Sequence, residues 1–517
     1  MSDTTRGGLD VTSRNDVDLL HGKAVGLIGV LFLTLTGSAP ITAMLLNVPI
    51  VVGNGNGIGS AAAFLVATVI LLVFSVGYAA MASKVTAVGG FYSFISQGLG
   101  RELGMAMGFG SVVAYSVFEP SLCGGFAYFM NLKLTALFGI NVPWPALALG
   151  MIALIAVLTY FDIKISSAVL GVALVGEVII LVIFDAGVFA HNGNSSVVQV
   201  AALNPIAAFQ GFPAHAKLTA GAAGIGLFFA FWSWVGFEMA PNYAEESKDP
   251  KRIVPLSLYI SVLFLGVLYT LTCWAGQSGF ANIDAAINEA QNNSATFFFD
   301  TATKLGASWV AVLMSYLILT GSFACGMAFH NTTSRYLYSL GRERIIPAAF
   351  GRTHKKYKTP YNASFLQSIV SALIVIAFAV LAGSNNPSTQ AYGELYGLMA
   401  LLGTIIILSA QAIVSVAIVV YFRREYPEEH HWWKTMIAPI LAFVAQVYIV
   451  YLCISNMAFL GGGFAFASYI PWIDLGTVVL GLLYAFYLKS ADREKFDKIG
   501  RLVFQGVPEP GIIGRNE

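Results

Sequence analysis

Long apolar stretches recur along the chain, and each is about as long as a bilayer is thick. Twelve such runs, continuous or punctuated by glycine, lie at about 22–48, 57–82, 102–131, 145–162, 165–190, 219–243, 254–277, 306–334, 363–383, 393–422, 435–458 and 467–489. A helix needs roughly 20 mostly apolar residues to cross a membrane. Strands of a membrane barrel would instead alternate over about ten residues. The pattern therefore predicts an all-α integral membrane protein with twelve transmembrane helices.

The polar segments between the runs indicate how the chain is oriented. Only three of the 28 Lys and Arg residues fall in the loops on one side, namely Lys133, Lys217 and Lys304. Cytoplasmic loops carry the excess of basic residues in membrane proteins. We therefore predict a multi-pass protein of the plasma membrane, or of the inner membrane if the cell is bacterial, with both termini in the cytoplasm. The predicted segments are the tail 1–21, helices 1–5 at 22–190, an extracellular loop at 191–218, helices 6–10 at 219–422, helices 11 and 12 at 435–489, and the tail 490–517.

Composition narrows the class of protein further. Apolar residues make up 57% of the chain and charged residues 11%, against about 25% charged in soluble domains. The net charge of +1 provides no field that would attract nucleic acid. The four cysteines lie in apolar runs, and no Cys or His pair has metal-ligand spacing. Because hydrolase and nucleotide-binding motifs are also missing, we expect no enzyme activity, metal or cofactor. The expected partners are the lipid bilayer and a small molecule.

Two spans contain residues that interrupt a helix. Proline lacks an N–H, and glycine tolerates non-helical dihedral angles. An interruption leaves N–H and C=O groups free to bind the two ends of an amino acid. The alternative is a simple kink. Five helices separate the two interruptions, which indicates a five-plus-five inverted repeat followed by two extra helices. The predicted substrate-binding residues at the breaks in helices 1 and 6 are Thr36, Gly37, Ser38, Ala39, Pro40, Phe231, Trp232, Ser233, Trp234 and Gly236.

Three segments carry a resemblance to a known family. These are residues 88–99 (VGGFYSFISQGL), 236–255 (GFEMAPNYAEESKDPKRIVP) and 335–347 (RYLYSLGRERIIP). They resemble the amino acid–polyamine–organocation transporters. The resemblance implies a leucine-transporter-like fold and a permease that works by alternating access. It also implies that Trp232 covers the substrate from outside and that Ser322 lies in a cation-site segment.

Acidic residues inside the spans are candidates for coupling and gating. A mid-membrane acid costs roughly 2.5–3.5 kcal/mol on insertion scales, and burial favours the protonated form of a carboxyl group, as a proton-coupled carrier requires. Glu177 matches a position where similar transporters place a lysine, and Glu238 matches an acid that works in gating. Glu119 would attract a cationic part of the substrate if it faces the pocket. His330 either joins a proton path or is a satisfied helix-end histidine.

A charged cluster follows helix 6 and is expected to lie beside the end of helix 8. Ion pairs there can latch an inside gate, whereas the alternative is a solvated loop. Its residues are Glu245, Glu246, Lys248, Lys251 and Arg252, facing Arg342 and Arg344.

These observations favour one function over two others. We expect a secondary transporter, a symporter that moves amino acids with protons. A neutral or apolar amino acid is the first expectation, because three aromatic residues lie at the second break. A polyamine or cationic amino acid is the alternative, because of the buried acids. A sensor built on a transporter fold is disfavoured, since the chain has no soluble signalling domain.

Overall fold

The structure is a computed structural model that describes residues 20, 22–161, 163–192, 200–210, 222–381 and 389–500. Most of the predicted tail 1–21, residues 501–517 of the other tail and much of the predicted loop 191–218 lie outside the described residues. The α-helices are α1 Leu27–Leu35, α2 Pro40–Ile50, α3 Ser60–Ala82, α4 Gly90–Leu99, α5 Arg101–Phe138, α6 Trp144–Tyr160, α7 Ile163–Asn192, α8 Ala222–Trp232, α9 Pro250–Ser278, α10 Ile283–Asn292, α11 Phe297–Lys304, α12 Ser308–Arg342, α13 Tyr361–Leu381, α14 Gly397–Glu425, α15 Ala438–Ser455, α16 Met457–Leu460, α17 Ile470–Ala491 and α18 Arg493–Lys498.

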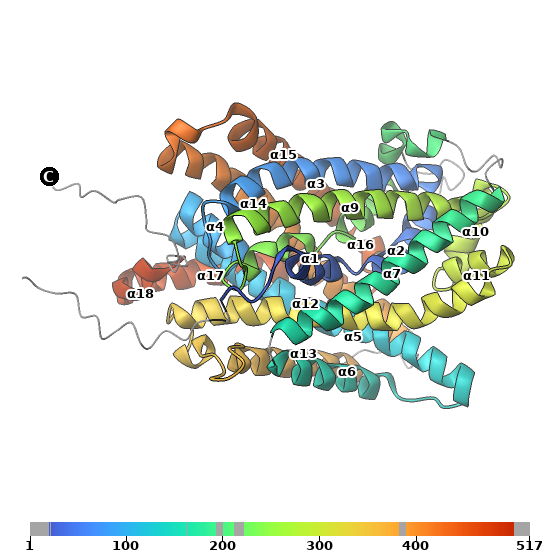
Figure 1. The fold of residues 1–517 in the computed structure, drawn as a ribbon, viewed down its shortest axis with the longest axis horizontal. Helices are drawn as coiled ribbons and strands as arrows, with labels where there is room; N and C mark the ends of the chain where they lie inside the picture. Colours follow the sequence, from blue (N-terminus) through green and yellow to red (C-terminus); the bar gives the residue numbers. More distant parts are fainter. Residues whose placement is uncertain are drawn as a thin grey trace, which may run out of the picture.

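The long helices run side by side and form one bundle (Figure 1). Helices α4 and α18 lie at one end of the bundle, and α10 and α11 lie at the opposite end. Helix α5 packs against α4, α12, α14 and α17, while α12 also contacts α7 and α13. Helices α5 and α12 therefore form the centre of the packing.

The bundle has the dimensions of a membrane protein. Among the described residues, ten helical segments are long and apolar enough to cross a membrane. They are Leu27–Gly55, Gly57–Ala82, Ser167–His191, Ala223–Tyr243, Pro250–Ser278, Ser308–Arg342, Tyr361–Leu381, Gln390–Glu425, Trp432–Ser455 and Ala465–Ala491. The multi-pass α-helical class is thus confirmed. The two other predicted spans, 102–131 and 145–162, correspond to α5 and the shorter apolar helix α6, and the count of twelve stays a prediction.

The outer helices expose apolar side chains, as expected of a surface that faces lipid. Large apolar residues more than half exposed occur on α7, α9, α13, α15 and α17. Examples, one from each of these helices, are Val172, Leu263, Leu373, Val444 and Leu480. A soluble protein rarely exposes so many apolar side chains together.

The first span is not one continuous α-helix. Helix α1 ends at Leu35, a 3₁₀ turn η2 covers Thr36–Ser38, and α2 begins at Pro40. Between them Ala39 has a φ of 42°, in the left-handed region. Proline has no N–H to continue the preceding helix and suits a first helical turn. The local chemistry of the sequence accounts for this change of geometry.

The sixth predicted span changes geometry in a similar way. Helix α8 ends at Trp232, and a 3₁₀ helix η8 covers Phe237–Tyr243. Gly236 lies just before η8 with a φ of 125°. A Cβ at Gly236 would lie 2.4 Å from the carbonyl carbon of Gly37 and 2.7 Å from the backbone nitrogen of Ser38. Only glycine lets the two backbones approach this closely.

Candidate functional site

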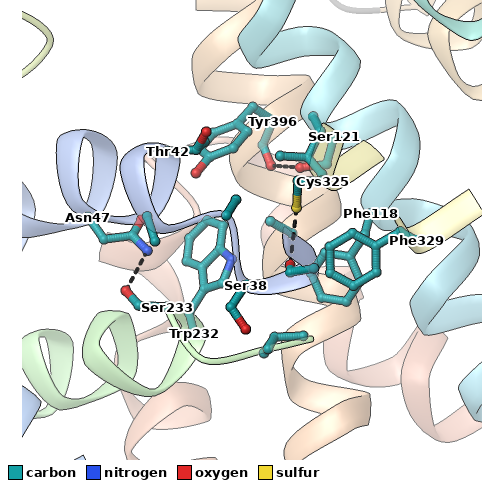
Figure 2. A pocket seen from close by; sticks show the side chains of 16 residues that line it. Ser38, Thr42, Asn47, Phe118, Ser121, Trp232, Ser233, Cys325, Phe329 and Tyr396 are labelled. Atoms are coloured by element: carbon teal, nitrogen blue, oxygen red, sulfur yellow. Dashed lines mark hydrogen bonds between the residues drawn. The ribbon is translucent and has the colours of Figure 1, made fainter. Parts of the chain in front are cut away.

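A small pocket lies where the two interrupted helices meet. Its volume is about 40 Å³, room for only a few water molecules. A ligand as large as an amino acid enters only if the lining moves. The lining residues come from α2, η2, α5, α8, α12 and α14 and the segments next to them, and are Gly37, Ser38, Ala39, Thr42, Ala43, Asn47, Phe118, Ser121, Leu122, Trp232, Ser233, Val235, Cys325, Phe329, Tyr396 and Ala400 (Figure 2).

One wall of the pocket is polar and joins the two interruptions. The Ser38 hydroxyl donates to the backbone carbonyl of Trp234 over 3.2 Å. The amide nitrogen of Asn47 donates to the Ser233 hydroxyl over 2.9 Å. The Cys325 thiol donates to the Gly37 carbonyl over 3.1 Å. These bonds tie α2 and the Ser233–Gly236 turn to each other and to α12.

The other wall is aromatic. The rings of Phe118 and Phe329 stack with their centroids 4.5 Å apart, and Trp232 stacks on Tyr396 at 5.7 Å. The Ser121 hydroxyl donates to the Tyr396 carbonyl over 2.7 Å, which ties α5 to the start of α14. In Figure 2 the Trp232 ring lies between the Asn47–Ser233 pair and the Phe118–Phe329 pair.

The ten residues predicted for the site divide into two groups. Gly37, Ser38, Ala39, Trp232 and Ser233 line the pocket. The others lie behind the lining, and they are Thr36, Pro40, Phe231, Trp234 and Gly236.

Trp234 is a neighbour of pocket residues in the sequence but does not line the pocket. The regular spacing of a helix does not predict which way the Trp234 side chain points, because the helix ends at Trp232. The Trp234 ring lies 6.0 Å from Phe64 of α3 and 4.9 Å from Tyr269 of α9, measured between centroids. The turn at Ser233–Gly236 therefore sends Trp234 outward while its neighbours Trp232 and Ser233 face the pocket.

No Asp, Glu, Lys or Arg occurs among the described residues that line the pocket. The buried acids lie around it instead. A buried charge without a partner is costly. The pocket is therefore suited to a ligand part that carries no charge.

Glu177 of α7 contacts the start of α2. Its side chain is fully buried, and its Oε2 accepts a hydrogen bond from the backbone N–H of Ile41 over 3.2 Å. Its Oε1 has no hydrogen-bond partner among the described residues. The carboxyl group thus satisfies one of the free N–H groups at the N-terminus of a helix. Ser322 stands nearby, one layer behind the pocket, with its hydroxyl 3.5 Å from that of Thr42.

Glu238 holds the second interruption in shape. Its Oε2 accepts from the backbone N–H of Gly236 over 2.9 Å, and its Oε1 accepts from the Tyr115 hydroxyl over 2.9 Å. Tyr78 of α3 donates to its backbone carbonyl over 3.2 Å. Glu238 therefore ties η8 to α3 and α5.

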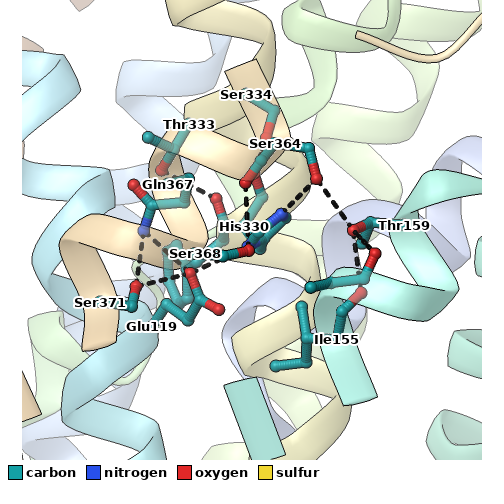
Figure 3. A network of polar contacts seen from close by, with 12 residues as sticks. Glu119, Ile155, Thr159, His330, Thr333, Ser334, Ser364, Gln367, Ser368 and Ser371 are labelled. Atoms are coloured by element: carbon teal, nitrogen blue, oxygen red, sulfur yellow. Dashed lines mark hydrogen bonds and ion pairs between the residues drawn. The ribbon is translucent and has the colours of Figure 1, made fainter. Parts of the chain in front are cut away.

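Glu119 lies behind the aromatic wall and outside the pocket lining. Its Oε2 lies 3.0 Å from Nδ1 of His330 and accepts from the amide of Gln367 and the hydroxyl of Ser371, over 2.9 and 2.8 Å (Figure 3). The sequence predicts that Glu119 attracts a cationic substrate if it faces the pocket. Glu119 does not face the pocket in this structure. His330 is not at a helix end either, since it lies within α12.

Two buried ion pairs join the segment after η8 to α12. Glu246 receives two hydrogen bonds from the Arg335 guanidinium, over 2.7 and 2.9 Å, and both side chains are 2% exposed. Glu245 pairs with Arg342 in the same way.

The alternative of a solvated loop does not hold for these two acids, which are buried. The basic members Lys248, Lys251 and Arg252 are exposed, but Lys251 and Arg252 lie in the first turn of α9 and not in a loop. Arg344 is exposed as well. The second pairing arginine is therefore Arg335 rather than the expected Arg344.

Comparisons with known proteins identify the family. Residues 25–479 match the family model described as amino acid permease. The chain belongs to the amino acid permease family. This confirms the resemblance to the amino acid–polyamine–organocation superfamily, whose members are transporters and not enzymes.

Three relatives show the range of this family. The branched-chain amino acid permease BcaP of Bacillus subtilis is 24% identical to this permease over 90% of each chain. The methylthioribose transporter of the same species is 22% identical, over 83% of this chain and 86% of its own. The low-affinity putrescine importer PlaP of Escherichia coli K12 is 24% identical, over 60% of this chain and 66% of its own.

Sequence reasoning missed several residues of the pocket in this permease. Asn47 could have been predicted from the sequence, because it is a lone amide inside an apolar run. Tyr396, Phe118 and Phe329 could not, because an aromatic residue in an apolar span usually packs in the core. Their place depends on how helices far apart in the sequence meet.

Proposed function

We propose that this permease moves a neutral amino acid across the membrane by alternating access, driven by protons. The observation that carries the proposal is the uncharged pocket between the two helix interruptions. Backbone carbonyl and N–H groups at the interruptions suit the ammonium and carboxylate of an α-amino acid, once they exchange present partners such as Cys325 for the Gly37 carbonyl and Glu177 for the Ile41 N–H. The aromatic wall suits an apolar side chain. The similarity to a branched-chain amino acid permease supports the same substrate class.

A polyamine is the second candidate, favoured by the similarity to a putrescine importer. A second ammonium group would need a carboxylate within reach in the pocket. The acids Glu119, Glu177 and Glu238 do not line it, so this substrate requires a rearrangement that the neutral amino acid does not.

Ligand-induced stabilisation of the purified protein distinguishes the two substrates. A ligand at a hundred times its Kd raises the free energy of unfolding by about 2.7 kcal/mol. We expect leucine-like amino acids to raise the melting temperature in detergent, and the Trp232→Ala variant to lose most of that shift. Stabilisation by putrescine alone would favour the second candidate. Stabilisation by neither class would contradict the proposed substrate classes.

The remaining architecture follows the same proposal. Both termini lie in the cytoplasm, and twelve spans form a five-plus-five inverted repeat with two further helices. The Glu246–Arg335 and Glu245–Arg342 pairs then lie at the cytoplasmic end and keep that side closed. Trp232 and Tyr396 close the pocket toward the outside.

Glu177 is the proposed coupling residue. It is buried between α7 and the start of α2, and one of its oxygens has no hydrogen-bond partner among the described residues. A proton at that oxygen would neutralise the group without breaking the bond to Ile41. The Ser322 hydroxyl of α12 lies 3.5 Å from the Thr42 hydroxyl of α2, in the same region.

The variant Glu177→Gln tests the coupling. Glutamine keeps the size of the side chain and an oxygen for Ile41, but it cannot exchange a proton. We expect proteoliposomes with this variant to exchange substrate and to lose accumulation driven by a pH gradient. Asp185→Asn is the matched control, since Asp185 lies on the same helix, is buried and is bonded to Thr272 away from the pocket. Accumulation by Glu177→Gln, or uptake that needs sodium and ignores pH, would contradict proton coupling through Glu177.

A further inference from the structure

A buried acid–base pair lies directly behind the pocket. The side chains of Glu119 and His330 are both 0% exposed, and their Oε2 and Nδ1 atoms are 3.0 Å apart. Placing ionisable groups at this depth in a membrane is costly, and such residues usually mark a proton or substrate path.

The hydrogen bonds around Glu119 indicate which nitrogen of His330 carries a proton while the carboxyl group is ionised. The Oε2 of Glu119 accepts from Gln367 and Ser371 of α13. Because an ionised carboxylate only accepts hydrogen bonds, His330 in that state donates its Nδ1 proton to the same oxygen. The atoms of the pair that can then take up a proton are Nε2 of His330 and Oε1 of Glu119, which has no hydrogen-bond partner among the described residues.

The far side of His330 suits both protonation states. Its Nε2 lies 2.8 Å from the Ser364 hydroxyl, which lies 3.1 Å from the Thr159 hydroxyl (Figure 3). Thr159 donates in turn to the Ile155 carbonyl over 2.8 Å. A neutral imidazole accepts from Ser364, whereas an imidazolium donates to Ser364, which then turns its own hydrogen to Thr159. One hydroxyl rotation therefore lets His330 take up a proton while its bond to Ser364 is kept, and it adds a bond from Ser364 to Thr159.

The other groups around the pair do not compete for this proton. Helix α13 presents the amide of Gln367 and the hydroxyls of Ser364 and Ser371, and α6 presents the hydroxyl of Thr159. Among the described residues, the titratable side chains in electrostatic contact with Glu119 are His330 and Cys123 of α5. The charge that faces the imidazole is thus that of Glu119.

The pair is linked to the pocket by its immediate neighbours. Phe118 precedes Glu119, and Phe329 precedes His330, and these two rings stack on each other in the pocket wall. Two neighbouring contacts therefore hold α5 and α12 together. The stacked rings face the pocket, and the acid–base pair faces α13. A change in the charge of the pair alters the Glu119–His330 contact, and with it the position of the aromatic wall that Phe118 and Phe329 form.

We propose that Glu119 and His330 form a proton-binding site, separate from Glu177, whose protonation state changes the affinity of the pocket for substrate. The proposal rests on the proposed function, since it assigns a second proton site to the same transporter. The proton binds at Nε2 of His330. It enters past Ser364 and Thr159, which lie in the first turn of α13 and at the end of α6. Substrate and proton then influence each other by equal factors, as linkage requires.

The test is the pH dependence of leucine binding to the purified protein, without any gradient. We expect the apparent Kd of the wild type to depend on pH, by up to about tenfold per pH unit for one linked proton. Glu119→Gln and His330→Gln should each flatten that dependence. Glu177→Gln should remove only the part of the pH dependence that belongs to Glu177, and should leave a part that Glu119→Gln removes. Ser368→Ala is the structural control, since the Ser368 hydroxyl donates to the Ser364 carbonyl of its own helix.

Each outcome decides between the alternatives. If both variants bind leucine with the wild-type dependence on pH, the pair is structural and the proposal is wrong. If Glu177→Gln alone flattens the curve, the proposed coupling stands and this inference fails. If leucine does not bind to the wild type, the proposed substrate fails, and the pair is tested by the melting temperature. A proton site makes the difference in melting temperature between wild type and Glu119→Gln vary with pH, and a difference that is constant with pH would overturn the proposal.

Discussion

The substitution Gly236→Ala is expected to abolish most transport, by at least about tenfold. A residue other than glycine in a left-handed conformation costs roughly 1–2 kcal/mol. A cost of about 1.4 kcal/mol already changes the equilibrium constant between the closely packed and the separated arrangement tenfold. The added methyl group would also press against backbone atoms of Gly37 and Ser38, at 2.4 and 2.7 Å. Backbone cannot move aside as a flexible side chain can, so the two interruptions must separate. Uptake of labelled leucine into proteoliposomes measures the effect.

Gly150→Ala provides the matched control for Gly236→Ala. Gly150 lies inside α6, and a Cβ there meets no atom within 4 Å. Alanine also favours a helix by about 1 kcal/mol over glycine, so we expect transport and stability to be kept or slightly raised. Equal transport by both variants would contradict the close approach of the two interruptions.

The second large effect is expected at the Glu246–Arg335 pair. Removing one partner of a buried ion pair leaves the other charge uncompensated and costs about 3–5 kcal/mol. Arg335 also donates to the Asn331 carbonyl over 2.9 Å and stacks on the Tyr243 ring. We therefore expect Glu246→Gln to lower the melting temperature markedly and to impair transport, as measured by thermal unfolding and by uptake.

An exposed pair and a double variant separate stability from gating. Lys84–Glu429 is an ion pair with side chains 26% and 54% exposed, so Glu429→Gln should cost only about 0–1 kcal/mol. Replacing both Glu246 and Arg335 by apolar residues removes both buried charges, and such replacements often restore stability. A double variant with normal stability and defective transport would support the gate. Normal transport by that variant would show that the pair only stabilises the fold.

The class of the protein followed from the sequence because it depends on local chemistry. Apolar length alone predicts membrane helices, and Gly37 and Pro40 predict a change of helical geometry wherever the rest of the chain lies. The left-handed Ala39 directly precedes Pro40, which cannot continue the preceding helix. The roles of these residues in binding stay predictions.

The contacts between distant helices could not be read in the same way. Glu119 and His330 are 211 positions apart, and nothing in either span marks the other as its partner. Glu246 pairs with Arg335 rather than with Arg342 at the end of α12 or Arg344 after it, because the rotation of that helix decides which side chain faces inward. Trp234 turned away from the pocket for a similar reason, since the turn before Gly236 breaks the helical period.

Counterflow in proteoliposomes tests the central claim most directly. Vesicles that contain the wild-type protein are loaded with unlabelled leucine and diluted into a trace of labelled leucine, with no ion gradient. We expect a transient accumulation of label that is absent from vesicles with Gly236→Ala and that an excess of external leucine suppresses. If the label does not accumulate with leucine or any other neutral amino acid, while putrescine gives full counterflow, the uncharged pocket is not the site of a neutral amino acid.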